Sequence, residues 1–253
     1  MNNIEKQYKT AQNLNTRISI HEKYSSNKQP FGDWIMSHYE MDAGFRILEL
    51  GCGTGSMWLG KLNLLEPDKH LILSDFSAGM LESARNNLGI HPQVVYQTID
   101  IQSIPYADDS FDMVIANMML YHVPDLHKGL SEVRRVLKRG GKFYCATYGE
   151  HGIMEFVNDT LRQYGIQGEI GRSFTLQSGG NTLRHHFSEV QMYTREDGLA
   201  VTDVDDFVEY VLSLSSLTGI SSLSCDLLHS AFETKMIEGI LYVPKEYGMF
   251  ICK

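Results

Sequence analysis

The sequence predicts an α/β fold built on a mostly parallel sheet, and two observations carry that prediction. Between residues 45 and 147, short apolar runs alternate with segments of helical periodicity, a pattern typical of βαβ units. The first apolar run, FRILEL, leads into the loop GCGTG, whose glycines are Gly51, Gly53 and Gly55. A glycine loop after a buried strand usually lies close to a nucleotide, so we expect this domain to bind one.

Each element of this sheet can be placed from the apolar pattern. Strands are expected at 45–50, 70–74, 94–99, 111–117 and 142–147. Helices are expected between them at 56–65, 77–88 and 126–138. Gly140 and Gly141 are expected to end the last of these helices.

The segments on either side of this core are less regular. Before it, residues 4–41 predict two helices broken at SSNKQP, with Pro30 in the first turn of the second. After it, the pattern predicts a helix near 151–164, a Gly/Ser-rich break at 178–180, a strand near 189–195, two helices within 203–238 and a strand at 248–252.

Composition excludes several classes of protein. The 253 residues carry a formal charge of −9, and a hold on nucleic acid phosphates needs a basic face, so nucleic acid is disfavoured as a partner. No apolar run approaches the ~18 residues of a membrane helix, and the N-terminus lacks the apolar region of a secretory signal. We therefore expect a cytoplasmic protein without membrane contact. The four cysteines form no CxxC pair, and no metal site is expected.

The spacing of the loop glycines separates two kinds of nucleotide. Dinucleotide folds carry GxGxxG, with a helix N-terminus facing a pyrophosphate. Here the string is GxGxG, and Glu49 lies directly upstream of it. A carboxylate there would repel a pyrophosphate and attract an ammonium or sulfonium group. The loop therefore favours a ligand with a positively charged tail.

Two further acids follow the next strands. Asp75, in LILSDFS, stands where an acid usually accepts ribose hydroxyls, and Ser77 can cap the following helix so that Asp75 is left free. Asp100 follows the third strand, where it could accept the amino group of an adenine. Phe76, Met80 and Ile101 offer apolar faces to its ring. A ribose, an adenine and a cationic tail together describe S-adenosylmethionine.

At these residues the chain resembles a known family. The stretches ELGCGTG, LSDFSAGML, DIQSIPYADDSFDMVIANMMLYHV and EVRRVLKRGGKF look like the successive motifs of class I S-adenosylmethionine-dependent methyltransferases, particularly those that methylate small molecules and quinones. The resemblance covers residues 45 to about 147. It implies a Rossmann-like, seven-stranded, mostly parallel sheet whose last strand is antiparallel, and YGMFICK is placed to be that strand.

The resemblance also implies the cofactor-binding residues. Glu49 to Gly55, with Cys52 among them, would surround the methionine portion of the cofactor, and Asp75 would take its ribose. Asp100, Ile101 and Gln102 would meet the adenine. Asn117 and Met118 would lie under the cofactor next to the substrate.

The parts outside the motifs are expected to form the substrate side. Residues 1–41 would be an N-terminal helical lid on a methyltransferase domain at 42–253, whose cap segments lie at about 150–186 and 196–238. In RISIHEKYS, Arg17, His21 and Tyr24 share one helix face, which either faces the active site or packs on the sheet. The lid and substrate residues are expected to include Tyr8, Arg17, Tyr121 and Tyr148.

Three residues are candidates for catalysis. His122, in MMLYHVPD, could accept a proton from a hydroxyl or amine, or it could simply bond the backbone or line the pocket. His21 and Tyr24 are the other two candidates. His185 and His186, by contrast, do not have the spacing of a metal-ligand set on one helix face.

The expected reaction is in-line transfer of a methyl group from S-adenosylmethionine to an O or N atom of a small molecule, leaving S-adenosylhomocysteine. An RNA or protein methyltransferase working with a partner, a nicotinamide-dependent oxidoreductase and a non-catalytic cofactor-binding protein remain alternatives. The protein is expected to be a monomer or a homodimer.

Overall fold

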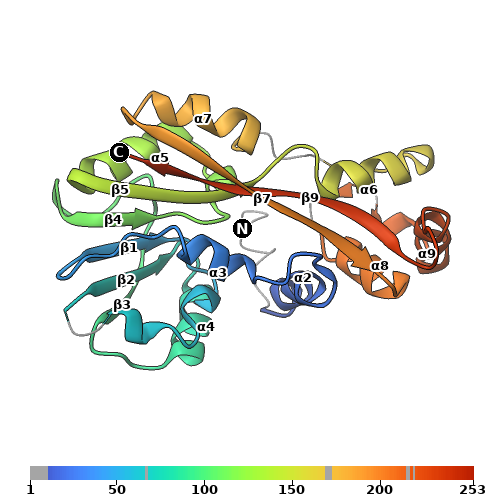
Figure 1. Cartoon of the computed structure of the whole chain (residues 1–253), viewed down its shortest axis with the longest axis horizontal. Helices are drawn as coiled ribbons and strands as arrows, with labels where there is room; N and C mark the ends of the chain where they lie inside the picture. The colour runs from blue at the N-terminus through green and yellow to red at the C-terminus, as the bar shows by residue number, and fades with distance from the viewer. Residues whose placement is uncertain (1–10, 66–67, 169–172, 215–216, 219) are drawn as a thin grey trace.

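A seven-stranded sheet forms the centre of the larger half of the molecule (Figure 1). The computed structural model describes residues 11–65, 68–168, 173–214, 217–218 and 220–253. The strand order is β3-β2-β1-β4-β5-β9-β7, and β9 runs antiparallel to both of its neighbours. The strands are β1 (Arg46–Leu50), β2 (His70–Asp75), β3 (Val94–Thr98), β4 (Phe111–Ile115), β5 (Leu137–Tyr148), β7 (Val190–Val201) and β9 (Leu241–Cys252). The predicted α/β fold, with an antiparallel last strand, is confirmed.

Helices cover both faces of this sheet. On one face, α3 (Phe31–Met36) and α4 (Ala78–Leu88) bury Ile35, Leu81 and Ala84 against β1 and β2. On the other face, α5 (Leu126–Val136) and α7 (Leu176–Arg184) bury Leu130 and Leu183. We call this half of the molecule the sheet region. Its parallel strands end together at one edge, where ligands bind in folds of this class.

Strands β7 and β9 extend beyond the sheet and carry a second hydrophobic core. Residues 247–252 of β9 pair with both β5 and β7, whereas residues 241–246 pair with β7 alone. This two-stranded ribbon buries Leu199, Val201, Leu241 and Val243 among helices. Those helices are α2 (Ala11–Tyr24), α6 (Ile153–Leu161), α8 (Val204–Leu212) and α9 (Cys225–Glu233), which we call the helical lobe (Figure 1).

The remaining elements are short. They are the 3-10 turns η1 (Ser56–Trp58), η2 (Leu62–Leu65), η3 (Leu120–His122), η4 (Arg162–Tyr164) and η5 (Ile220–Ser222), and the paired strands β6 (Gln167–Gly168) and β8 (Leu217–Thr218). The predicted helix at 56–65 is therefore wrong, because the chain forms η1 and η2 instead. Gly60 between them has a φ of 70°, a left-handed conformation through which a right-handed helix cannot continue.

The glycines after α5 do not end that helix. It stops at Val136, and Leu137 already pairs with Phe111 of β4. Gly140, with a φ of 80°, and Gly141 lie inside β5, where the register to β4 shifts. A Cβ on Gly141 would come within 2.8 Å of the Asp112 carbonyl oxygen, so the glycine permits the irregular pairing.

The predicted Gly/Ser-rich break at 178–180 is also wrong, because it lies within α7. Thr175 and Ser178 form a capping box, in which each side chain accepts the other's backbone N–H. A Cβ on Gly179 would lie 3.0 Å from the rings of Phe174 and Phe250. The glycine is a close helix-to-sheet contact rather than a helix breaker.

The two helices predicted at each end of the chain are confirmed as α2, α3, α8 and α9, as are the helix starting near 151 and the strand near 190. Both β7 and β9 are longer than expected, with twelve residues each. Their additional residues form the ribbon, where burial alternates along 241–245 as in a strand with one covered face.

Candidate active site

The glycine loop after β1 has a left-handed backbone. Gly51, Gly53 and Gly55 have φ values of 71°, 56° and 74°. A Cβ on Gly51 would lie 2.9 Å from the Met119 side chain, and one on Gly55 would lie 2.7 Å from Leu88. The loop between β1 and η1 therefore keeps bare backbone, as direct contact with a ligand requires. Cys52 is buried in it and donates its N–H to the Ser74 carbonyl at 2.8 Å.

Glu49 lies at the end of β1 with only 3% of its surface exposed. Its carboxylate accepts a hydrogen bond from the Trp58 indole, Nε1 to Oε2, at 2.5 Å. Burial raises the pKa of Glu49 to about 7, although the Trp58 hydrogen bond acts in the opposite direction. Trp58 is fully buried, so it holds the carboxylate in one position.

Asp75 closes the other side of the loop. Its Oδ2 accepts the Gly53 N–H at 2.9 Å and its Oδ1 accepts the Ser77 N–H at 2.8 Å. Ser77 caps α4, as predicted, but Asp75 is not free of the backbone as expected. Because a carboxylate oxygen has more than one lone pair, each oxygen of Asp75 can still accept a hydrogen bond from a hydroxyl group. Burial raises the pKa of Asp75, and its backbone hydrogen bonds partly offset this effect.

The loop thus has two acids beside bare backbone, Glu49 buried and Asp75 partly buried. In the part of the chain that the structure describes, neither Glu49 nor Asp75 forms an ion pair with a lysine, arginine or histidine. Buried carboxylates without a cation are unfavourable, and a ligand with a positive tail would relieve that cost. These two hydrogen-bond acceptors therefore fit a ligand that combines a cation with hydroxyl groups.

The side chains next to Asp75 differ in exposure. Phe76 is 61% exposed beside the loop, so its ring is free to cover a ligand. Met80 is 3% exposed inside α4 and belongs to the core below. Phe76 and Met80 were both predicted to offer an apolar face to the adenine ring. Only Phe76 has an exposed side chain that could do so.

Residues 100–102 form a turn after β3 that is held by hydrogen bonds between its own residues. Asp100 accepts the Gln102 backbone N–H at 2.8 Å and its side-chain amide at 3.2 Å. Gln102 in turn accepts the Asp125 N–H at 3.1 Å, which links the turn to the start of α5. Ile101 is buried against Gly129. This turn keeps the Asp100 carboxylate at the sheet edge.

Asn117 is committed to structural contacts. Its Nδ2 donates to the Tyr39 hydroxyl at 2.6 Å, and its Oδ1 accepts the Ala146 N–H of β5 at 3.1 Å. Met118 follows with a φ of 54°, which is rare outside glycine, and donates its N–H to the Ala146 carbonyl at 2.8 Å. The pair fixes the chain where it leaves β4, so that Met119 lies against Gly51.

An aromatic group follows directly. The Tyr121 ring lies 4.5 Å from the His122 ring and 4.7 Å from that of Tyr148. Burial, with a smaller contribution from the charge of Arg17, lowers the pKa of His122 to about 4. His122 is therefore neutral at physiological pH. These three rings come from η3 and the end of β5, and Met119, which precedes η3, lies against Gly51 of the glycine loop.

The face of α2 that carries Arg17, His21 and Tyr24 packs on α8. Arg17 donates to the Ser213 hydroxyl at 3.4 Å and to its carbonyl, and Tyr24 donates to Asp206. The His21 ring lies edge-on to Tyr210 and Tyr247, 5.9 Å from each. Its Nδ1 is buried without a hydrogen-bond partner among the described residues. Tyr8 lies outside the described residues.

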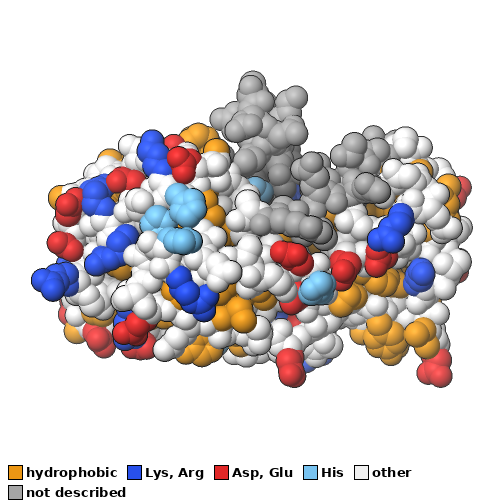
Figure 2. All heavy atoms as spheres, turned by 90° about the horizontal axis from the view of Figure 1, so that it is seen from above, with side chains coloured by type: hydrophobic (Ala, Val, Ile, Leu, Met, Phe, Trp, Pro, Cys, Tyr) orange, Lys and Arg blue, Asp and Glu red, His pale blue; other side chains and the backbone are white. Residues whose placement is uncertain are grey.

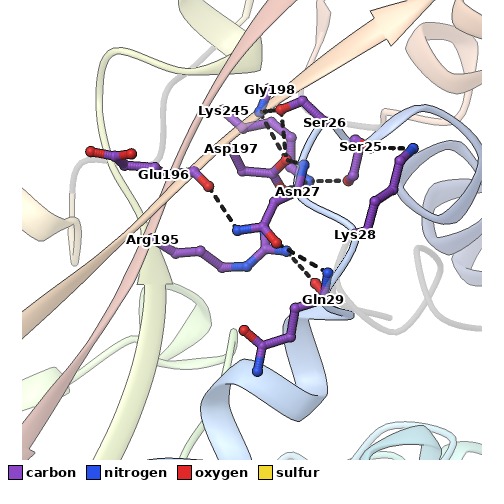
Figure 3. A network of polar contacts seen from close by, with 10 residues as sticks. All are labelled: Ser25, Ser26, Asn27, Lys28, Gln29, Arg195, Glu196, Asp197, Gly198 and Lys245. Atoms are coloured by element: carbon purple, nitrogen blue, oxygen red, sulfur yellow. Dashed lines mark hydrogen bonds and ion pairs between the residues drawn. The ribbon is translucent and has the colours of Figure 1, made fainter.

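A buried ionic network ties the segment between α2 and α3 to the ribbon (Figure 3). Asp197 pairs with Arg195 and Lys245, and these three side chains are at most 3% exposed. Burial alone would raise the pKa of Asp197, but hydrogen bonds from Lys245 and the Asn27 backbone lower it to about 2. Lys245 also donates to Ser25 at 2.7 Å. The network fixes where α2 ends.

Sequence reasoning missed three residues at this site: Trp58, Tyr210 and Tyr247. Trp58 could have been suspected, since a buried aromatic residue three positions after the loop faces the acid before it. Tyr210 and Tyr247 carry no local signal, because they meet His21 only when distant segments come together.

Three features find no support in the part of the chain that the structure describes: a metal site, a membrane-spanning helix and a nucleic-acid surface. Among the residues described, no three histidines, cysteines or acids are grouped to hold a metal ion, although His127 and His186 approach to 3.0 Å. No described helix is long and apolar enough to cross a membrane. Figure 2 shows lysines and arginines interspersed with acids on the face it presents, without the continuous basic surface that nucleic acid needs.

Comparison with known proteins places these residues in a family context. The family model described as "Methyltransferase domain" matches residues 48–145. A demethylmenaquinone methyltransferase of Clavibacter sepedonicus is 41% identical over 106 residues, which cover 42% of this chain and 42% of that protein. The ubiquinone/menaquinone biosynthesis C-methyltransferase UbiE of Pasteurella multocida is 28% identical over 185 residues, covering 71% and 68%.

Other relatives differ in their acceptor. A malonyl-[acyl-carrier protein] O-methyltransferase of Hahella chejuensis is 30% identical over 142 residues, covering 55% of this chain and 49% of that protein. The chain spans about half the length of several curated relatives that it matches. Among solved structures, the YcgJ protein of Bacillus subtilis is similar, with 22% identity, a TM-score of 0.57, and coverage of 87% and 95%, a likeness in fold.

Proposed function

This chain contains a class I S-adenosylmethionine-dependent methyltransferase domain, and on that premise we propose that it transfers a methyl group to an O or N atom of a small-molecule acceptor. The observation that carries the proposal is the pair of acids beside the glycine loop, the buried Glu49 and the partly buried Asp75, neither of which has a cationic partner among the described residues. Those acids suit the ammonium and ribose of this cofactor.

S-adenosylmethionine supplies a methyl group that its sulfonium has already activated. In our proposal, the backbone of Gly51 to Gly55, with Cys52 among them, and the Glu49 carboxylate hold the methionine portion. Asp75 accepts the ribose hydroxyls, and Asp100, Ile101 and Gln102 border the adenine, with Phe76 over its ring. Met119 against Gly51 and the rings that follow it define the acceptor side.

The main task of such a site is to position the acceptor atom near the methyl carbon. Tyr121, His122 and Tyr148 surround the place where it would lie. With a pKa of about 4, His122 is a weak base at neutral pH, so it orients an acceptor by hydrogen bonding more readily than it removes a proton. Tyr24 donates to Asp206 of α8 and the His21 ring contacts Tyr247 of β9. In our proposal these two residues affect the acceptor only indirectly, through the residues that they contact.

A heteroatom acceptor is our preference over carbon because the acceptor side carries hydrogen-bonding groups, Arg17, His122 and several tyrosines. The relatives are divided, since one is named a C-methyltransferase and another an O-methyltransferase. The remaining parts of the proposal are a cytoplasmic location, a monomer or homodimer, and no nucleic acid partner.

Calorimetry tests the cofactor assignment. We expect S-adenosylhomocysteine to bind and NADH not to bind. Asp75→Asn should weaken binding of S-adenosylhomocysteine at least roughly tenfold, because a charged hydrogen-bond acceptor to the ribose is lost. Asp108→Asn, at an acid 74% exposed, is the matched control and should bind normally. An unchanged dissociation constant in Asp75→Asn, or binding of NADH alone, would overturn the assignment.

The acceptor atom is tested separately. Incubation with ¹³C-methyl-labelled S-adenosylmethionine and pools of small molecules should give products with a mass gain of one methyl group. The chemical shift of the labelled carbon distinguishes O-, N- and C-methyl products. A C-methyl product alone would contradict the preference for a heteroatom while leaving the cofactor assignment intact.

A further inference from the structure

Positive charge collects where the helical lobe meets the sheet region. Arg17 on α2 and the buried Arg195 and Lys245 of the ribbon are three cations, and Asp197 is the one carboxylate paired among them in the described part of the chain. The excess is notable because the whole protein has a formal charge of −9. Arg195 and Lys245 are buried and Arg17 is partly buried, and such a local excess of positive charge is costly unless something negative binds near it.

Arg17 is the cation placed to meet a ligand. Its Nε and one terminal nitrogen donate to Ser213, the last residue of the α8 turn, which is an ordinary helix-capping contact. A guanidinium has five N–H donors, so this contact does not exhaust it. Among the described residues no acid forms an ion pair with Arg17. Its charge nevertheless acts on His122 in the sheet region and Tyr210 in the helical lobe. After burial, it is the second cause that lowers the pKa of His122, and it offsets part of the rise that burial causes in the pKa of Tyr210.

Aromatic rings with polar ends lie on both sides of this junction, where Tyr148 of β5 pairs with Tyr247 of β9. Tyr121 lies against His122 and Tyr148 on the sheet side. On the lobe side, His21 lies between Tyr210 and Tyr247, and the Tyr247 ring is 5.3 Å from Phe31. Rings of this kind bind flat ligands by stacking and edge contacts.

We infer, on the premise of the proposed function, that the methyl acceptor is a planar aromatic acid whose anionic oxygen binds the Arg17 guanidinium while its ring lies among these tyrosines. Arg17 then determines specificity. A guanidinium and a carboxylate form charge-assisted hydrogen bonds, which are about twice as strong as neutral ones. A neutral analogue would leave Arg17 without its partner.

Matched acid and amide probes test this inference. Hydroxylated benzoates and naphthoates, each paired with the corresponding carboxamide, are titrated into the protein saturated with S-adenosylhomocysteine. We expect acids to bind at least roughly tenfold more tightly than their amides. Arg17→Gln should abolish this preference, and Arg17→Lys should keep part of it because the charge remains.

Lys23→Gln is the matched control, since it removes a cation from the same helix at a 58% exposed position and should keep the acid preference. Binding of S-adenosylhomocysteine and the melting temperature are measured for every variant, so a failure to fold is recognised. Equal affinity for acids and amides, no binding of any acid, or a preference that survives Arg17→Gln would overturn the inference. Loss of S-adenosylhomocysteine binding by the unmodified protein would instead overturn the proposed function.

Discussion

The sheet region and the helical lobe build their parts of the site from different kinds of contact. At the glycine loop, the decisive hydrogen bonds join residues close in sequence: Trp58 to Glu49, nine apart, and Gly53 to Asp75, 22 apart. At the lobe, Arg17 meets Ser213 across 196 residues, and Lys245 meets Ser25 across 220. The cofactor side is therefore encoded locally, whereas the acceptor side forms only when both ends of the chain come together.

The largest effect is expected where those ends meet. Asp197→Asn leaves Arg195 and Lys245 buried without a carboxylate, and breaking a buried pair in this way costs about 3 to 5 kcal/mol. Urea denaturation should show the helical lobe unfolding before the sheet region. Asp108→Asn, at an exposed acid, should change the free energy of unfolding by less than about 1 kcal/mol. If Asp197→Asn also lost less than about 1 kcal/mol, the distinction between the two regions would be wrong.

The same carboxylate predicts a pH dependence. Because its pKa is lowered from 3.8 to about 2 in the folded protein, its stabilising contribution is complete above pH 4 and disappears as the pH falls toward 2. Acid titration followed by circular dichroism should show this component in the unmodified protein and not in Asp197→Asn. Identical acid transitions in the two would contradict it.

Glu49 should show the opposite behaviour. Its pKa rises from 4.5 to about 7 on folding, so the folded protein loses stability between those pH values and remains at the lower level above them. Glu49→Gln keeps an acceptor for Trp58 but removes the buried charge, and should stabilise the ligand-free protein at pH 8 by about 2 kcal/mol. It should also weaken S-adenosylhomocysteine binding.

Thermal unfolding at pH 4 and pH 8 measures this difference. At pH 4 the carboxyl is largely protonated, so the variant and the unmodified protein should have nearly equal stability. If Glu49→Gln destabilises the protein equally at both pH values, the buried charge is not the cause.

Two alanine substitutions separate backbone strain from packing in the loop. Gly51 and Gly44 both have a left-handed φ, 71° and 75°, but only at Gly51 would a Cβ meet another side chain, that of Met119. Each alanine should cost about 1 kcal/mol for the conformation alone. Gly51→Ala should cost about 1 kcal/mol more, measured by urea denaturation. Equal losses would mean that Met119 moves aside freely.

The sequence predicted the sheet region far better than the helical lobe. The positions of the core strands, the glycine loop and Glu49 follow from local pattern, because each strand and its loop are contiguous. The ribbon was missed because its alternating residues include Pro244, which reads against a strand, and because its register with β7 depends on distant segments. For the face of α2, the spacing of Arg17, His21 and Tyr24 predicted a functional surface but could not reveal that the face packs on α8. Which of these residues contact a ligand stays a prediction.

The smallest effect tests whether the two regions share one site. Arg17 belongs to the helical lobe and His122 to the sheet region, and the charge of the first lowers the pKa of the second. Arg17→Gln should therefore raise the pKa of His122 from about 4, by less than one pH unit because burial is the larger cause and solvent screens the charge. NMR titration of the His122 imidazole measures the change, with Lys23→Gln as a control that leaves it unaltered. An unchanged His122 pKa in Arg17→Gln would mean that the lobe does not reach the acceptor side, and the comparison drawn between the two regions would then describe two separate sites.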